Sequence, residues 1–501
     1  MGLLAWVGLV PLMVAISGRS SGLGFLLSYI CGIIFFAGVF TWIFDVAGYK
    51  IWHHAVLGVF FGLYFGFFGW AFNFISKRLG IIYGYFAAPF FWVCLEYLRS
   101  NLSFMALPLP LLAHSQYQFP VIIQIASLTG AYGISFLVVS VNAALSAMFF
   151  ASVRSTGINA KKRPTHSLLS MRGKIAIMLS TASVVAFVLL YGKLNLSEPH
   201  TGKMIKVSVV QGNIDRQKKL NPRRHKKFIM QRYADLTKKA SKDGAALIVW
   251  PEAATPGFVL KKLPLMKKTV SLIRETKTHF IIGSSEYPKF IKERFDPKKY
   301  GNTAIFFSPE GKVLGQYLKI KLTPFGEFIP YDEIIPWPKF IVPEGKKSFE
   351  LPGEDHTIFE LNGAKFGVII CWESHFPGLF RAFVKKGANF MLNITNEGWF
   401  GEAGLYQKMV TSVFRAVENR VSIARAANTG VSCFIDPYGR ITGRVQNNGK
   451  DILVEGYLTQ NIPLSHERTF YTSYGDVFVY LSIIMMGLII VLSIFRSKKR
   501  P

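Results

Sequence analysis

Three stretches of the sequence each follow a strand-like apolar run with a residue that can do chemistry. The stretch LIVWPEA carries Glu252, YLKIKLTPFGE carries Lys319, and GVIICWES carries Cys371. In layered α/β folds, functional side chains gather where strands end. These three residues lie far apart in the chain, and we expect them to form one site.

The chemistry that this set predicts is nucleophilic catalysis by a cysteine. Glu252 can take the thiol proton of Cys371 and later return a proton to a leaving group. Lys319 can stabilise both the thiolate and the oxyanion of a tetrahedral intermediate. A cysteine at a strand-to-helix turn also lies near a helix N-terminus, where the helix dipole favours a thiolate. His375 is an alternative partner for the thiol, but we expect it on the following helix, FPGLFRAFVKK, facing away from the sulfur.

Each of these residues also has an ordinary structural explanation. An isolated cysteine is most often a small buried core residue. Taken singly, Glu252 is a loop carboxylate, Lys319 a surface lysine and Glu327 a turn residue between proline and glycine. Their shared position after strand-like runs favours the functional interpretation over these separate ones.

The amino-acid composition indicates a membrane protein. Of 501 residues, 50% are hydrophobic and 17% charged, and the apolar residues crowd into the first two hundred positions and one segment near the end. A spanning helix needs about twenty mostly apolar residues. The segments that meet or approach this length are Leu23–Phe44, Ala55–Ile75, Leu79–Tyr97, Gly130–Ala151, Ile175–Tyr191 and Val477–Phe495.

A shorter apolar segment, Leu3–Ile16, lies at the start of the sequence. It has no basic residues before it, so it does not have the pattern of a signal peptide. Counted as a span, it brings residues 1–195 to about six spans. Its short length leads to the hypothesis that the sequence as numbered lacks one helix.

Basic residues near the ends of the apolar segments predict the orientation in the membrane, because short cytoplasmic loops carry an excess of Lys and Arg. Such residues precede Ile175–Tyr191, follow Ala55–Ile75 and end the chain. They are Lys77, Arg78, Arg154, Lys161, Lys162, Arg163, Arg172, Lys174, Arg496, Lys498, Lys499 and Arg500. The chain between Tyr191 and Val477 is therefore expected outside the cytoplasm.

The net charge of +29 has two explanations. Contact with anionic lipid headgroups fits a chain with spanning segments. A nucleic-acid groove fits less well, because the basic residues form no recognisable DNA- or RNA-binding motif, and we expect no nucleic-acid partner. Four cysteines lie without metal-ligand spacing, so we expect no disulfide framework, metal or other cofactor.

Residues 203–467 have the composition of a water-exposed α/β domain, and residues 474–496 of a final spanning helix. Strand-like runs alternate with helical ones, and the turn Pro309-Glu310-Gly311 predicts a hairpin. Helical segments are expected at Pro222–Lys242 and Tyr406–Arg420. Strands and helices mixed with hairpins predict a layered α/β sandwich.

The motif order WPEA, KxxLTPFGE and CWE resembles the nitrilase superfamily, whose Glu–Lys–Cys triad would be Glu252, Lys319 and Cys371. The flanking motifs VQGNI, PFGEFIP, NITNEGWFG and RAANTGVSCFID are similar to those of the apolipoprotein N-acyltransferase family, a membrane-embedded branch of that superfamily. The likeness continues into the apolar part, with LEYLRS, HSQ and GAYGISFLVVSVN. It implies an α-helical membrane domain joined to a nitrilase-like α-β-β-α sandwich.

The resemblance implies a two-step acyl transfer in the bacterial inner membrane, as the last step of lipoprotein maturation, with the α/β domain on the periplasmic side. Cys371 would take an acyl chain from a phospholipid, typically phosphatidylethanolamine. The α-amine of the diacylglyceryl-modified N-terminal cysteine of an apolipoprotein would then accept the chain from the thioester.

The resemblance also implies roles for individual residues. Glu252 would be the general base and Lys319 the oxyanion stabiliser, helped by a Trp372 N–H. The supporting residues would be Glu327, Trp372, Glu373 and Trp399, the last at the lipid entrance. This chain departs from the family pattern at Leu220, at Asn396-Glu397-Gly398 and at Lys408, where the family usually has histidine. The lining of the lipid pocket and the headgroup preference therefore stay open.

Three other functions share some of these sequence features. A membrane-tethered amidase or nitrilase would pass the acyl group to water, and it shares the same triad. A receptor or scaffold with an inactive nitrilase-like domain fits less well, because the Glu, Lys and Cys are all present. A transporter fits least, because Glu96 and Arg99 are among few ionisable residues in the apolar segments.

Overall fold

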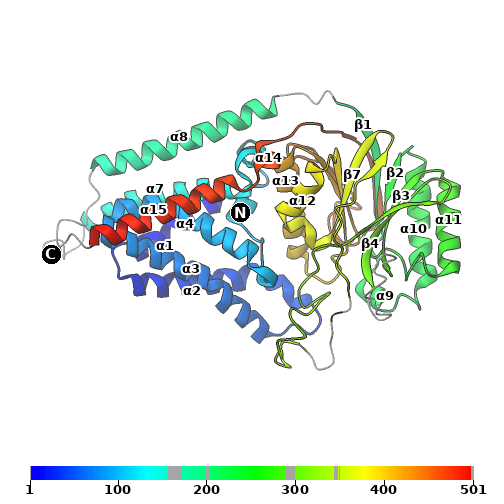
Figure 1. Ribbon diagram of the computed structural model, residues 1–501, viewed down its shortest axis with the longest axis horizontal. Helices are drawn as coiled ribbons and strands as arrows, with labels where there is room; N and C mark the ends of the chain where they lie inside the picture. The colour runs from blue at the N-terminus through cyan, green and yellow to red at the C-terminus, as the bar shows by residue number, and fades with distance from the viewer. Residues whose placement is uncertain are drawn as a thin grey trace. The chain divides into compact units, whose positions relative to one another are not determined.

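The computed structural model describes residues 2–155, 171–197, 202–287, 300–342, 348 and 350–497 (Figure 1). The chain forms two compact units. The helical unit comprises Met1–Thr41, Gly48–Glu198 and Tyr474–Pro501, and the α/β unit comprises Trp42–Ala47 and Pro199–Ser473. The predicted cytoplasmic basic residues Lys161, Lys162, Arg163, Lys498, Lys499 and Arg500 lie outside the described residues.

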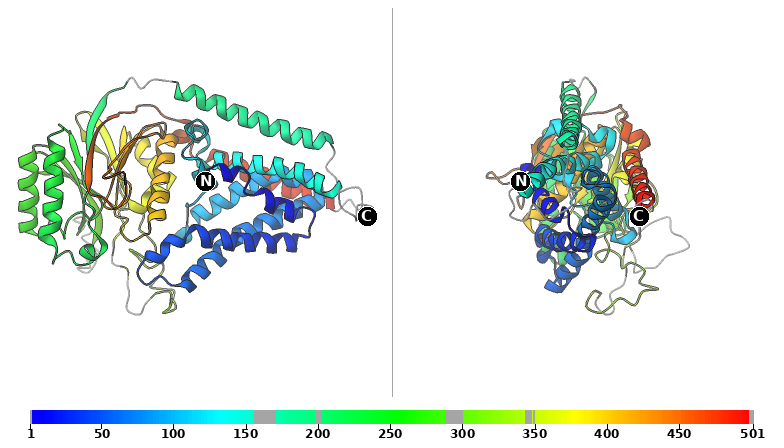
Figure 2. Two further views of the ribbon diagram at one scale, coloured as in Figure 1. Left: turned by 180° about the vertical axis from the view of Figure 1, so that it is seen from behind. Right: turned by 90° about the vertical axis from the view of Figure 1, so that its left-hand side faces the viewer.

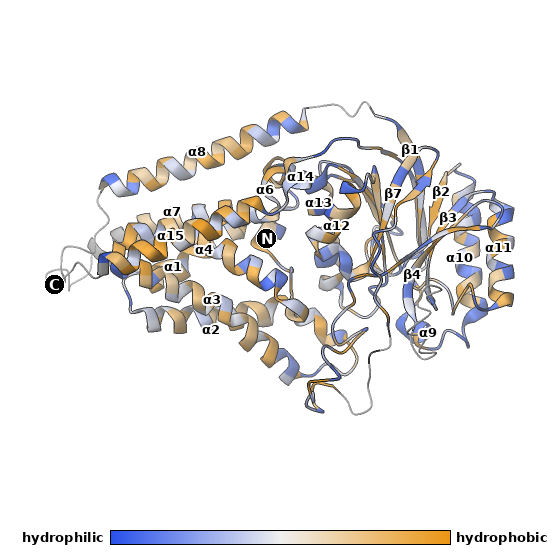
Figure 3. Cartoon of the chain, in the orientation of Figure 1, coloured by the Kyte–Doolittle hydropathy of each residue, from blue (hydrophilic) through white to orange (hydrophobic). Residues whose placement is uncertain are grey.

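The helical unit contains long apolar helices. Its elements are η1 (Gly2–Trp6), α1 (Val10–Ile16), α2 (Ser21–Val39), α3 (Ile51–Leu79), α4 (Ile81–Asn101), η3 (Ser103–Met105), η4 (Leu112–Gln116), α5 (Pro120–Ile123), α6 (Ala126–Thr129), α7 (Ala131–Ser155), α8 (Met171–Leu196) and α15 (Val477–Ser497). Within the described residues, six of these, α2, α3, α4, α7, α8 and α15, are long and apolar enough to cross a membrane. Figure 3 shows hydrophobic residues along their length. The short Leu3–Ile16 segment is divided between η1 and α1.

Small residues allow α2 and α3 to pack closely. A Cβ atom on Gly69 would lie 2.3 Å from the carbonyl oxygen of Gly24, and one on Gly62 would lie 3.0 Å from the backbone nitrogen of Ile33. Membrane helices commonly associate through small residues because these let two backbones approach. Larger side chains at these glycines would force the two helices apart.

The first sheet of the α/β unit has six strands in the order β12-β1-β2-β3-β4-β5. The strands are β1 (Met204–Gln211), β2 (Leu247–Val249), β3 (His279–Glu286), β4 (Gly301–Phe307), β5 (Val313–Leu318) and β12 (Gly456–Pro463). The central strands β1, β2 and β3 run parallel, and the outer strands pair antiparallel. The predicted hairpin at Pro309-Glu310-Gly311 joins β4 to β5.

The second sheet also has six strands, in the order β11-β10-β9-β8-β7-β6. They are β6 (Phe359–Leu361), β7 (Ala364–Ile370), β8 (Phe390–Thr395), β9 (Ser422–Ala427), β10 (Cys433–Ile435) and β11 (Ile441–Arg444). Here β7, β8 and β9 run parallel, again between antiparallel edges. Val368, Ile369 and Ile370 are fully buried, as their β-branched run predicts.

The two sheets pack face to face between two pairs of helices, α10 (Lys226–Ser241) with α11 (Leu263–Thr276) and α12 (Pro377–Lys385) with α13 (Glu402–Asn419) (Figures 1 and 2). Phe306 of β4 meets Phe366 of β7 edge to face, with ring centroids 5.4 Å apart. On the outer side of the first sheet, Tyr233 of α10 stacks on Trp250. The α-β-β-α sandwich and the helical membrane part are thus as expected. The remaining helices are α9 (Arg216–Leu220), η7 (Cys371–His375) and α14 (Phe470–Tyr474).

The segment between α2 and α3 belongs to the α/β unit, which the sequence did not indicate. The expected span Leu23–Phe44 is too long, because α2 ends at Val39 and a 3₁₀ helix, η2 (Thr41–Asp45), follows. We call residues 42–47 the linker segment. The Trp42 indole Nε1 donates a hydrogen bond to Gln407 Oε1 at 3.1 Å, and the Trp42 carbonyl accepts one from the Gly401 N–H at 3.2 Å. A Cβ atom on Gly404 would lie 2.6 Å from the Trp42 ring, so this glycine makes room for the indole.

Candidate active site

Glu252 lies just beyond β2 and is held by donors from both sheets. Its Oε1 accepts a hydrogen bond from Asn302 Nδ2, at the start of β4, at 2.6 Å. Its Oε2 accepts one from the backbone N–H of Asn396, after β8, at 2.6 Å. The side chain is almost fully buried. These contacts fix both carboxylate oxygens, as a positioned proton acceptor requires.

Lys319 directly follows β5, and its side chain is completely buried. Its ammonium donates to Glu327 Oε1 at 2.5 Å and lies 3.6 Å from Glu252 Oε1. Burial by itself lowers the pKa of Lys319, but Glu327 and then Glu252 raise it well above its usual value. The lysine is therefore a fixed positive charge.

Glu327 and Glu350 complete the acidic surroundings of Lys319. The second oxygen of Glu327 accepts a hydrogen bond from the Thr323 N–H at 2.7 Å. The same carboxylate therefore stabilises the loop before it and binds Lys319. Burial, reinforced by the charge of Glu327, raises the pKa of Glu350 to about 8. Glu350 was not singled out from the sequence.

Cys371 is the residue after β7 and the first residue of η7. Its φ of 52° lies in the left-handed region, which costs a non-glycine residue about 1–3 kcal/mol and is common at functional turns. The α-helix expected directly after Cys371 begins only at Pro377, with the short helix η7 in between. Burial, followed by the charge of Glu252, raises the pKa of the Cys371 thiol to about 11.

Glu373 ties the lysine strand to the cysteine strand. Its Oε1 accepts hydrogen bonds from the Tyr317 hydroxyl at 2.8 Å and from the N–H groups of Ile320 and Lys321, which follow Lys319. Its Oε2 accepts one from the Ile370 N–H, just before Cys371, at 2.7 Å. Burial raises the pKa of Glu373, although these donors oppose the shift. This geometry makes Glu373 a positioning residue.

Trp372 and His375 pack together in η7. Their ring centroids are 4.8 Å apart, edge to face, and Trp372 also meets Phe376. His375 Nδ1 lies 3.1 Å from the Thr411 hydroxyl of α13. His375 was expected on the following helix, but it is the last residue of η7, and α12 begins only at Pro377.

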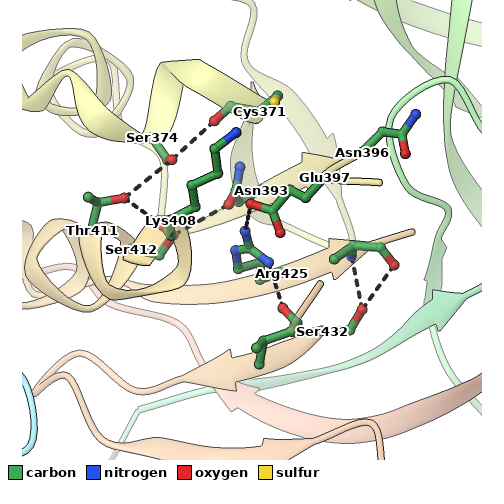
Figure 4. Close-up of polar contacts among 12 residues, drawn as sticks. Cys371, Ser374, Asn393, Asn396, Glu397, Lys408, Thr411, Ser412, Arg425 and Ser432 are labelled. Carbon is green, nitrogen blue, oxygen red and sulfur yellow. Dashed lines mark hydrogen bonds and ion pairs between the residues drawn. The ribbon is translucent and has the colours of Figure 1, made fainter. Parts of the chain in front are cut away.

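Trp399 is half-buried in the loop that joins β8 to α13. The guanidinium of Arg216 lies 5.5 Å from its ring centroid, and Arg216 also donates to the Asp45 carbonyl of the linker segment at 2.8 Å. The start of this loop is anchored by a buried ion pair, Arg425 Nη2 to Glu397 Oε1 at 2.6 Å (Figure 4). The loop is thus fixed by a buried ion pair at Glu397, whereas the side chain of Trp399 is more accessible.

Several residues of the site could not be selected from the sequence. Asn302 and the backbone of Asn396 bind Glu252, and Lys219 donates to the neighbouring Ala253 carbonyl. Burial lowers the pKa of Lys219 to about 8, against the charge of Glu252. The only signal for Asn302 was its place at the start of a strand-like run. Within the described residues, we find no group of three or more His, Cys, Asp or Glu side chains arranged to hold a metal ion.

The sequence matches two known domain families. Residues 206–465 match the carbon-nitrogen hydrolase family, and residues 1–144 match the apolipoprotein N-acyltransferase N-terminal domain. The apolipoprotein N-acyltransferase of Geobacter metallireducens is 33% identical over 99% of this chain and 91% of its own length. That of Chlorobaculum tepidum is 26% identical over 99% of this chain and 92% of its own length.

A solved structure is similar to about half of the chain. It is a mutant amidase of the nitrilase superfamily from Nesterenkonia AN1, with a TM-score of 0.39 and 19% identity, covering 52% of this chain and 92% of that chain. The sequence matches, which extend over almost the whole chain, therefore carry the comparison.

Proposed function

Because the chain belongs to the apolipoprotein N-acyltransferase family, we propose that it transfers a fatty acyl chain from a phospholipid to the N-terminal α-amine of diacylglyceryl-modified apolipoproteins. In this proposal Cys371 carries the acyl chain as a thioester. The reaction is the last step of lipoprotein maturation. It takes place at the extracytoplasmic face of the bacterial inner membrane.

The first half of the reaction forms the thioester. Glu252 takes the proton from the Cys371 thiol, and the thiolate attacks the ester carbonyl of the phospholipid. Lys319 stabilises the resulting oxyanion by its charge. The bond between the carbonyl carbon and the glycerol oxygen then breaks, and Glu252 returns its proton to the departing lysophospholipid oxygen.

The second half passes the acyl chain to the amine. The α-amine of the lipoprotein attacks the thioester carbonyl and gives one proton to Glu252. The carbon–sulfur bond breaks, and the proton on Glu252 returns to the sulfur. The products are an amide and the free Cys371 thiol, so the enzyme is ready for another cycle.

The single observation that supports this proposal best is the convergence on one site of residues predicted from three distant stretches. Glu252 and Lys319 lie 3.6 Å apart, and both act electrostatically on the Cys371 thiol. Glu373 ties the backbone beside Lys319 to the backbone beside Cys371. In this arrangement Glu327 fixes Lys319, whereas Trp372 and Trp399 line the approach of the substrates.

Membrane attachment fits the substrates. Both carry acyl chains, and each buried CH₂ contributes about 0.8 kcal/mol to membrane binding, so neither leaves a bilayer readily. Six helices of this chain are long and apolar enough to span one. A membrane-bound thiol can therefore meet both substrates without extracting them fully.

Mass spectrometry of Cys371→Ala tests the proposal. We expect the purified wild-type protein, incubated with phosphatidylethanolamine, to gain one acyl mass on the Cys371 peptide. A lipopeptide amine should discharge this adduct, whereas water should do so only slowly. We expect the variant to form no adduct and to lose transfer.

Cys31→Ala, in α2, is the matched control and should behave as wild type. Acyl transfer by Cys371→Ala would contradict the proposal. Rapid discharge by water with no amide product would instead indicate a membrane-tethered hydrolase.

A further inference from the structure

A second lysine, Lys408, extends toward Cys371 from α13 (Figure 4). It lies in the second turn of that helix, and only 4% of the residue is exposed. Its Nζ lies 3.5 Å from the centroid of the Phe400 ring. In the part of the chain that the structure describes, we find no carboxylate paired with this ammonium and no hydrogen bond from it.

The charges that face Cys371 come from several elements. Glu252 follows β2, and Lys319 follows β5 with Glu327 bound to it. Glu350 lies near this cluster, and Glu373 lies on η7 itself. The one positive charge of Lys319 is therefore already matched by two carboxylates, and a thiolate would add further negative charge.

Lys408 is placed differently from Lys319. A buried ammonium without a counter-ion is costly, and an aromatic ring offsets only part of that cost. The remainder is recovered when an anion forms nearby. Cys371 is a group toward which Lys408 extends and which acquires negative charge during the reaction.

We propose that Lys408 is the second cation of the active site, and that its ammonium stabilises the Cys371 thiolate formed when the thiol proton moves to Glu252. The inference rests on the proposed role of Cys371 and deepens it. In agreement, burial and then Glu252 raise the pKa of the Cys371 thiol, whereas Lys408 and, after it, Lys319 lower it. The ring of Phe400 in turn meets the Trp42 ring edge to face, with ring centroids 5.2 Å apart.

The pH profile of Cys371 alkylation tests this role. The full-length protein in detergent micelles is treated with iodoacetamide at a series of pH values, and carboxamidomethylation of the Cys371 peptide is followed by mass spectrometry. Lys408→Met should move the midpoint upward by about one pH unit, which is about tenfold slower alkylation at a fixed pH below it. Lys408→Arg should restore most of the wild-type profile.

The controls separate charge from structure. Lys408→Gln is a second neutral variant and should repeat the shift, and the thermal unfolding of each variant shows whether it folds. An unchanged midpoint in a folded neutral variant would overturn the inference. So would a change confined to the dependence of acylation on phospholipid concentration, which would assign Lys408 to the lipid phosphate. Alkylation of Cys371 does not require acyl transfer. An unchanged alkylation midpoint can therefore be distinguished from a failure of the proposed function.

Discussion

The two sheets of the α/β unit share a pattern but supply different chemistry. Each has three parallel strands between antiparallel edges. The first sheet supplies Glu252 and Lys319, and the loop after β5 supplies Glu327. Both carboxylates contact the ammonium of Lys319. The second sheet supplies the sulfur of Cys371 and the backbone N–H of Asn396, with Lys408 on the following helix.

This difference separates the proton carrier from the nucleophile. The acidic and basic groups of the first sheet hold one another in place before any substrate binds. The second sheet presents a thiol whose pKa is raised to about 11 by burial and then by the charge of Glu252. Among the contacts that join the two sheets, the hydrogen bonds of Glu252 and Glu373 lie at the site, and they are where the comparison can be tested.

Removing the proton acceptor of the first sheet should have the largest effect. Glu252→Gln keeps the size of the side chain but cannot take the thiol proton. We expect thioester formation to slow by about 10²–10⁴-fold, measured in a single turnover with phospholipid. Glu360→Gln, on the exposed side of β6, is the control and should leave the rate unchanged. A rate within a factor of two of wild type in Glu252→Gln would assign the base to another group.

Loosening the tie between the sheets should have an intermediate effect. Glu373→Gln replaces one carboxylate oxygen by an NH₂ group, so at least one buried backbone N–H loses its acceptor, at a cost of about 1–3 kcal/mol in unfolding free energy. A small displacement of Cys371 from Lys319 should lower the acylation rate by about 10²-fold. Both are measurable, by chemical unfolding and by single-turnover acylation.

Tyr317→Phe is the matched control for this tie, because it removes one of the donors to Glu373 and leaves the carboxylate. We expect a smaller loss of stability and of rate. Equal effects in the two variants would show that Glu373 does not act through the backbone N–H groups.

The last prediction concerns the pH dependence of stability, not a rate, on the first-sheet side. The pKa of Glu350 in the folded protein, about 8, is above its usual value near 4. Its contribution to stability is therefore full below pH 4 and is lost as the pH rises through 8. Glu350→Gln stays neutral, so its melting temperature minus that of wild type should rise from pH 5 to pH 9. A difference that is constant with pH would contradict this.

Much of the site was predictable because strand ends are easy to recognise. The β-branched run before Cys371 and the apolar run before Glu252 each predicted a strand that ends just before the residue. The motif in the loop after β5 indicated Glu327. The sandwich followed from strands mixed with helices and hairpins. Each of these signals is local in the sequence.

What could not be predicted depends on contacts between distant segments. Asn302 and the Asn396 N–H bind Glu252 from two different sheets, and no pattern around them indicates it. The raised pKa of Cys371 follows from burial and then from the charge of Glu252, which comes from a distant stretch of the sequence. The short helix η7 between β7 and α12 was not predicted either. Likewise, hydropathy alone predicted a span that continues to Phe44, whereas α2 ends at Val39. Hydropathy cannot tell whether an apolar residue such as Trp42 faces lipid or packs on Gly404.

The linker segment has a practical consequence for anyone who wishes to isolate the enzymatic half. The α/β unit consists of two separate stretches of the chain, residues 42–47 and 199–473. A fragment limited to residues 199–473 therefore lacks Trp42, and the surface that its side chain covers at Gly401 and Gly404 becomes exposed. The same truncation removes the aromatic contact between Trp42 and Phe400 and the hydrogen bond from Arg216 to the Asp45 carbonyl. A soluble version therefore needs residues 42–47 grafted back.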